Sequence, residues 1–100
     1  MLIDMIEQIV AKDSFEVLGR KLSLNGLQLD SLGEYQLIAD FEINPAMCGP
    51  VGAMFSKLFC NVSVGYAKGI VYLNYEYRYE HPDGGRNGKE VRRVVNLNQE

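Results

Sequence analysis

The chain contains one histidine, His81, and two cysteines, Cys48 and Cys60, and these small numbers exclude several kinds of site. Two cysteines cannot build the disulfide framework of a small secreted domain, so we expect a reducing, cytoplasmic setting. One histidine and two cysteines that are twelve residues apart match no zinc-ligand spacing. The sequence therefore predicts no metal site and no cofactor.

A hydrophobic segment long enough to cross a bilayer is also missing. The first ten residues, MLIDMIEQIV, are apolar, but they include Asp4 and Glu7 and no basic residue, which is not the composition of a secretory signal. An acidic polar side also argues against attachment to a membrane surface. We expect no association with membranes.

The sequence lacks a catalytic constellation. Nucleophilic catalysis needs a nucleophile beside a base, and His81 lies far along the chain from both cysteines. Cys48 precedes Gly49-Pro50, where a helix N-terminus could lower a thiol pKa, but a small apolar residue that enters a buried helix explains the position better. The stretches GPVG and DGGRNG lack the GK[ST] ending of a phosphate-binding loop. We expect no catalytic residues and no enzymatic activity.

The chain also lacks a large excess of either positive or negative charge. The net charge is −3, with −5 over residues 1–45 and +2 over residues 46–100. Within residues 75–93, bases stand among tyrosines, a pattern that can bind nucleic acid. The same stretch holds five basic and four acidic residues, a balance of only +1. Nucleic acid is therefore the weaker alternative as a partner.

Hydrophobic periodicity predicts one small α+β domain over residues 1–100. It would have two helices and a mostly antiparallel sheet of about five strands, in the order α-β-β-β-α-β-β. Apolar residues recur at helical spacing over 2–10 and 51–59, and they alternate over 22–29, 35–43, 71–79 and 91–97. A bulge at Gly26 in one long strand would explain the change of alternation at Asn25-Gly26, but the two residues favour a type I′ hairpin turn that would pair Leu24 with Leu27 and Lys21 with Asp30.

Two surfaces are candidates for binding. The expected second helix has a small, barely charged outer face made of Ala53, Ser56, Lys57 and Cys60, which another element or a second subunit would cover. In the tail hairpin, pairing residues whose numbers sum to 168 places Glu76 opposite Arg92 and Arg78 opposite Glu90. This register leaves four residues at the hairpin tip, with the two cations unpaired: His81, Asp83, Arg86 and Lys89.

The sequence is best explained by a non-enzymatic protein-binding module that acts through its surface and its tail hairpin. Such a protein could be a small inhibitor, an adaptor or an assembly or chaperone-like factor, with another protein as its partner or with itself in a homodimer. Two alternatives stay open. One is a nucleic-acid-binding module that uses the basic hairpin tip, and the other is a small-ligand pocket between helix and sheet, lined by Phe41, Met54, Phe55, Phe59 and the tyrosines.

Overall fold

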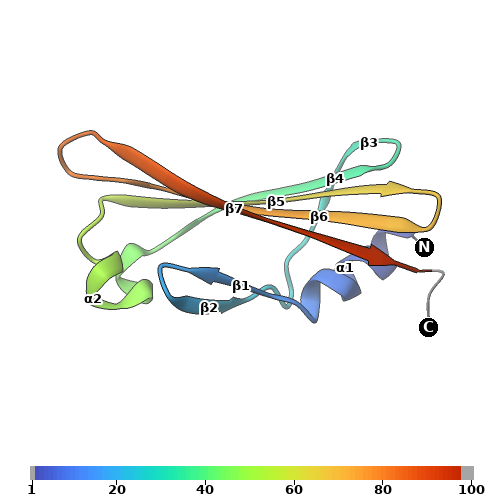
Figure 1. Ribbon diagram of the computed structural model, residues 1–100, viewed down its shortest axis with the longest axis horizontal. Helices are drawn as coiled ribbons and strands as arrows, with labels where there is room; N and C mark the ends of the chain where they lie inside the picture. Colours follow the sequence, from blue (N-terminus) through green and yellow to red (C-terminus); the bar gives the residue numbers. More distant parts are fainter. Residues whose placement is uncertain (1, 98–100) are drawn as a thin grey trace.

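The computed structural model describes residues 2–97 and has the small α+β architecture that the sequence predicts. An antiparallel sheet contains β3 (Asp30–Gly33), β4 (Gln36–Ile43), β5 (Lys57–Ala67), β6 (Ile70–Glu80) and β7 (Arg86–Asn96), and each strand pairs with its neighbour in the chain. Helix α1 (Leu2–Ala11) and the hairpin of β1 (Ser14–Val17) and β2 (Arg20–Ser23) lie on one side of this sheet (Figure 1). The short elements η1 (Pro45–Cys48) and α2 (Gly49–Gly52) lie at one end.

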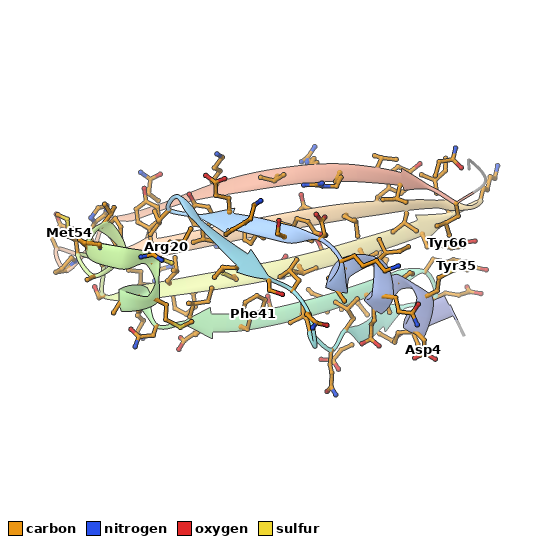
Figure 2. The ribbon with its side chains drawn as sticks, turned by 90° about the horizontal axis from the view of Figure 1, so that it is seen from below. Asp4, Arg20, Tyr35, Phe41, Met54 and Tyr66 are labelled. Carbon is orange, nitrogen blue, oxygen red and sulfur yellow. The ribbon has the colours of Figure 1, made fainter. Side chains whose placement is uncertain are left out.

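The core fills the space between the sheet and the elements that lie on that side. Figure 2 shows these elements in front of the sheet. Because side chains alternate across a strand, each central strand sends every second residue into the core. Helix α1 contributes Ile6 and Val10, and β1 contributes Phe15 and Val17. The central strands supply Leu58, Cys60, Val62, Val64, Val71, Leu73, Tyr75 and Tyr77. The other face of the sheet, which we call the open face, carries the intervening residues and has none of these elements against it.

The prediction of a hairpin at Asn25-Gly26 was wrong. Strand β2 pairs with β1, which places Lys21 opposite Glu16, and residues 24–29 form an irregular segment. Leu27 N donates to Leu24 O at 3.2 Å, so a turn does form there. Positive φ occurs at Gly26 but not at Asn25, whereas a type I′ turn needs it at both positions. The leucines still face the core, since Leu24 and Leu29 are buried.

The type I′ geometry occurs instead at two turns that lack asparagine. Leu18 and Gly19 connect β1 to β2 with φ of 50° and 81°, and Lys68 and Gly69 connect β5 to β6 with φ of 52° and 79°. Each pair is the two-residue loop of a hairpin, and its twist matches that of the flanking strands. Glycine supplies the second position, while a side chain is held in the left-handed region at the first.

The second helix is much shorter than expected. It ends at Gly52, and the chain from Lys57 onward is strand β5. The apolar residues at 51, 54, 55, 58 and 59 match a helical stripe, but Leu58 also begins the alternation of buried residues along β5. Because β5 pairs with both β4 and β6, its backbone N–H and C=O groups form hydrogen bonds on two sides. This pairing outweighs the local helical pattern.

The tail hairpin forms, but its predicted register was wrong by two residues. Paired residue numbers sum to 166, so Glu76 lies opposite Glu90 and Arg78 opposite Gly88. The shift of two leaves every side chain on its predicted face, and alternation alone therefore could not distinguish the two registers. A tight loop sets the observed one: His81 N donates to Gly85 O at 2.7 Å.

No helix within residues 2–97 is long and apolar enough to span a membrane.

Candidate functional site

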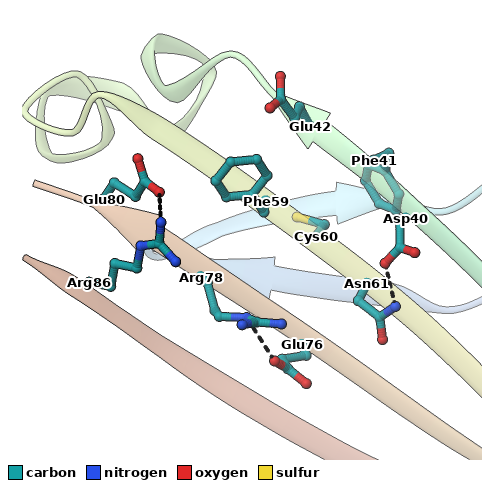
Figure 3. Close-up of a pocket in the computed structure, with 10 residues that line it drawn as sticks. All are labelled: Asp40, Phe41, Glu42, Phe59, Cys60, Asn61, Glu76, Arg78, Glu80 and Arg86. Atoms are coloured by element: carbon teal, nitrogen blue, oxygen red, sulfur yellow. Dashed lines mark hydrogen bonds and ion pairs between the residues drawn. The ribbon is translucent and has the colours of Figure 1, made fainter. Parts of the chain in front are cut away.

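A groove of about 530 Å³ lies on the open face, close to the end of the sheet where the tail hairpin turns (Figure 3). Strand β4 supplies one side of this open-face groove, β5 its floor, and β6 and the start of β7 the other side. Side chains on three adjacent strands meet here because the register places Glu42, Phe59 and Arg78 in one row across the sheet. The lining consists of Asp40, Phe41, Glu42, Phe59, Cys60, Asn61, Glu76, Arg78, Glu80 and Arg86.

Phe59 is the aromatic side chain on the floor of the groove. It projects on the open face and is half-buried, while its strand neighbours Leu58 and Cys60 are buried in the core below. An aromatic ring on a solvated sheet face has no core to fill, and such rings are frequent anchors in protein interfaces. Phe59 thus offers an apolar contact point surrounded by charged groups.

The charges around Phe59 are mixed, with an acidic excess. Arg78 Nε lies 3.1 Å from Glu76 Oε1, and Arg86 Nη2 lies 3.0 Å from Glu80 Oε1. The amide of Asn61 donates to Asp40 Oδ1 at 2.6 Å, and Glu42 has no charged partner within residues 2–97. The groove therefore contains four carboxylates and two guanidinium groups, a balance of −2.

The two ion pairs are exposed at their basic ends, with 67% of the Arg78 side chain and 72% of the Arg86 side chain accessible. Exposed pairs of this kind contribute only about 0–1 kcal/mol each. Both arginines can therefore exchange their carboxylate for one from a partner at little cost. The groove has adaptable charged walls around a fixed aromatic floor.

The structure separates the four residues of the hairpin tip. Arg86 lines the groove and is paired with Glu80, so the prediction that it lacks a partner was wrong. Lys89 lies opposite Tyr77 and is exposed, and no ion-pair partner for it occurs in the described part of the chain. Asp83 accepts a hydrogen bond from Gly85 N at 3.1 Å, which shapes the loop.

His81 belongs to a cluster of aromatic rings at the base of the tail loop. Its ring packs edge-on against Phe55 and Tyr79, with centroids 4.9 and 5.5 Å apart, and Phe55 and Tyr79 are themselves 4.2 Å apart. This aromatic cluster joins the segment after α2 to the base of the tail loop. His81 therefore holds the hairpin end against the body of the domain.

The outer helix face expected from Ala53, Ser56, Lys57 and Cys60 does not exist. Ala53 and Ser56 lie between α2 and β5, Lys57 opens β5, and Cys60 is buried. Large apolar side chains are exposed in this part of the chain instead, with Met47 62%, Val51 55% and Met54 70% accessible.

Both cysteines are buried free thiols. Burial raises the pKa of Cys48, although the nearby Arg20 opposes this shift. Burial also raises the pKa of Cys60, to about 12, and the nearby Cys48 adds to the increase. A reactive cysteine needs the opposite shift, so neither thiol is activated as a nucleophile. Within residues 2–97 no group of three or more His, Cys, Asp or Glu side chains could hold a metal ion.

The sequence contains a signal for this groove that the helical reading of residues 51–59 concealed. Over 58–66 apolar residues alternate with Phe59, Asn61, Ser63 and Gly65, the pattern of a strand with one buried face. The alternation over 35–43 correctly places Asp40 and Glu42 on a solvated strand face. Only the pairing of β4 with β5 brings them beside Phe59.

No protein-family model, curated protein or solved structure matches the chain.

Proposed function

We propose that the protein is a non-enzymatic protein-binding module whose open-face groove receives a segment of another protein. The observation that supports this most strongly is the half-buried ring of Phe59 at the floor of a 530 Å³ groove on a sheet face that no helix of residues 2–97 covers. A grooved face with an aromatic anchor and a polar rim has the composition of a protein interface. The two free, buried thiols suit action in a reducing cytoplasm.

Charge complementarity indicates the chemistry of the partner segment. Asp40 and Glu42 project from β4 on one side of Phe59, and no cation of the described residues neutralises either of them. A basic side chain of the partner would lie against these two carboxylates, and an adjacent apolar or aromatic side chain would pack on Phe59. The adaptable guanidinium groups of Arg78 and Arg86 would accept carboxylates or backbone carbonyls of the same segment.

The pairing of cations along the tail favours a protein partner over nucleic acid. Arg78, Arg86, Arg92 and Arg93 are each within ion-pair distance of a carboxylate of this chain. A surface that binds along a phosphate backbone offers several unpaired cations. Among the described residues of this hairpin, only Lys89 is a cation without an ion-pair partner. A small-ligand pocket between helix and sheet is a poorer fit as well, because Phe59 projects on the open face and Met54 is 70% exposed.

Selection of peptides from a random library on the immobilised protein tests the proposal. We expect enrichment of sequences in which Lys or Arg adjoins an aromatic or large aliphatic residue. Their affinity should fall at least tenfold with Phe59→Ser, and similarly with Asp40→Lys combined with Glu42→Lys. Tyr72→Ala, at the other end of the open face, is the matched control and should leave binding unchanged. Peptides that bind all variants equally would refute the assignment of the groove.

A further inference from the structure

Strand β7 forms one edge of the five-stranded sheet over its whole length, from Arg86 to Asn96. It pairs with β6 on one side, and no strand within residues 2–97 pairs with its other side (Figures 1 and 2). An uncovered edge of eleven residues is a template for another strand, and proteins normally shorten, bend or cover such edges or place charged side chains along them, as β7 does. The opposite edge does follow this rule, because β3 has four residues and a bulge between Ser31 and Gly33.

Two hydrogen bonds establish which backbone groups point outward from β7. His81 N donates to Gly85 O at one end of the β6–β7 ladder, and Leu97 N donates to Gly69 O at the other. Hydrogen-bonded positions alternate along an antiparallel pair, so the odd-numbered residues of β7 direct their N–H and C=O groups toward β6. Over residues 86–94 the even-numbered positions direct theirs to the free edge, namely Arg86, Gly88, Glu90, Arg92 and Val94.

Glu90 and Arg92 on this edge are complementary to the same two residues of a second copy in one register. If a second β7 lies antiparallel to the first with Val91 facing Val91, Glu90 of each copy faces Arg92 of the other. Both residues are among those whose backbone groups point outward, so the same pairs exchange backbone hydrogen bonds. In the single chain Glu90 and Arg92 contact each other within their strand, with the Arg92 side chain 81% exposed. In the dimer, the Glu90 carboxylate and the Arg92 guanidinium of the two copies can form two ion pairs across the interface.

Neighbouring registers are disfavoured by the same charges. A shift of two in one direction places Glu90 opposite Glu90, and a shift in the other direction places Arg92 opposite Arg92, and like charges directly opposite each other are destabilising. In the favoured register the exposed Val94 covers Gly88 of the other copy. Lys89 does face Arg93, but the Arg93 guanidinium already lies 3.3 Å from Asp13 Oδ2, which offsets its charge.

We propose that β7 is the interface of a symmetric homodimer, in which two copies of this chain join their sheets through the Val91-centred register. The two five-stranded sheets then form one continuous sheet with β3 of each copy at its ends. The two-fold axis uses both β7 edges, so the assembly closes at two copies and does not extend into a fibre. This interface lies outside the row of Glu42, Phe59 and Arg78, and it stands whether or not the groove binds a partner.

Charge exchange at residues 90 and 92 tests the interface. We expect the unmodified protein to sediment as a dimer, and Glu90→Arg and Arg92→Glu alone each to weaken self-association at least tenfold. Mixing the two single variants should restore a dimer, because each Arg then faces a Glu, and the double variant E90R/R92E should dimerise by itself. Far-ultraviolet circular dichroism shows whether each variant keeps the sheet. A monomer at 100 µM, or a dimer that both single variants retain, would overturn the proposal.

A disulfide tests the register. Directly opposite residues in a non-hydrogen-bonded antiparallel pair have Cα atoms about 4.5 Å apart, which is within the range that a disulfide spans. Val91→Cys should therefore form a covalent dimer under mild oxidation. Val94→Cys is the matched control, because the two introduced thiols would be about 20 Å apart in this register, and the native cysteines are buried. Cross-linking of the Val94→Cys variant but not of the Val91→Cys variant would exclude the Val91-centred pairing.

Discussion

The phenol of Tyr75 donates a hydrogen bond of 2.8 Å to Asp13 Oδ2, although 62 residues separate the two in the chain. The same carboxylate accepts from Ser14 N through its other oxygen at 2.9 Å and lies 3.3 Å from Arg93 Nε. Asp13 follows α1 and precedes β1, so one side chain connects the covering elements to both β6 and β7. Only 15% of the Asp13 side chain is exposed, so these contacts are largely shielded from water.

Loss of this carboxylate should destabilise the domain. We expect Asp13→Ala to lower the free energy of unfolding by about 2–3 kcal/mol, because it leaves the Tyr75 hydroxyl and the Arg93 guanidinium without their acceptor. Tyr75→Phe removes one hydrogen bond only and should cost about 1 kcal/mol. Urea unfolding measures both values, with the exposed Glu34→Ala as control. Equal effects of Asp13→Ala and Glu34→Ala would show that the Asp13 contacts contribute nothing.

Stability should fall in alkaline solution through Cys60. Its pKa is raised from 9.0 to about 12 by burial, so the folded state prefers the neutral thiol. The stabilisation is complete below pH 9, where the unfolded thiol is also neutral, and it is lost as the pH rises from 9 through 12. Tyr75 acts in the same direction, since burial and its bond to Asp13 raise its pKa above 10.0.

Unfolding free energies measured at about pH 7, 9 and 10.5 check this expectation. Cys60→Ala removes the thiol, and the loss of stability across the two alkaline points should be smaller in this variant than in the unmodified protein. Cys48→Ala is the comparison, because burial raises the pKa of that thiol as well, while the charge of Arg20 opposes the increase. An identical pH profile for Cys60→Ala and the unmodified protein would contradict the prediction.

The Lys68-Gly69 turn should be improvable. Lys68 is exposed and has φ of 52°, a conformation that asparagine adopts more readily than lysine. We expect Lys68→Asn to raise the unfolding free energy by about 0.5–1 kcal/mol, and Gly69→Ala to lower it because φ there is 79°. Thermal unfolding measures both. Lys57→Asn, at an exposed strand position, is the control and should give no gain.

Gly88 should be required for the register of the tail hairpin. A Cβ at this position would lie 2.6 Å from Tyr77 O and 2.9 Å from Arg78 Cγ, closer than real contacts allow. We expect Gly88→Ala to destabilise the domain by about 1–3 kcal/mol. Gly65→Ala is the control, because its nearest neighbour would be Tyr72 Cβ at 4.0 Å. Amide exchange along β6 and β7 would show whether the variant shifts the pairing.

Period-two alternation was sufficient to predict β4 and β6, because each has one face toward the core and one solvated face. It also placed Val91 and Val95 of β7 on the core face, where they are partly buried. The segment 51–60 failed for a physical reason: Val51, Met54, Phe55 and Leu58 satisfy a helical stripe, while the sheet partners of β5 that override it are remote in sequence. The type I′ turns at Leu18 and Lys68 were not predicted, because the only turn signal in the sequence at each is the glycine that follows.

The open-face groove was predictable in its parts but not in its assembly. The sequence alone indicates that Asp40 and Glu42 are solvated and that Arg78 and Arg86 belong to a hairpin. It does not place Phe59 between them, because that requires the β4–β5 register, whose partners are as much as 29 residues apart, from Gln36 to Gly65. Charge pairing also led to the wrong register for the tail hairpin. Glu76 pairs with Arg78 on its own strand, and Arg92 pairs with Glu90 on its own strand, so neither needs a partner across the hairpin.

The pairing of every strand with its neighbour in the chain also affects how the protein folds. All four junctions of the five-stranded sheet join strands that are consecutive in the chain, so each pairing closes a shorter loop than a crossover connection would, and shorter loops favour faster folding. Strands β5 to β7 can form in sequence as a meander before the first quarter of the chain docks. Closure of the Asp13–Tyr75 contact is a late event on this route, so Asp13→Ala should accelerate unfolding while leaving the folding rate nearly unchanged.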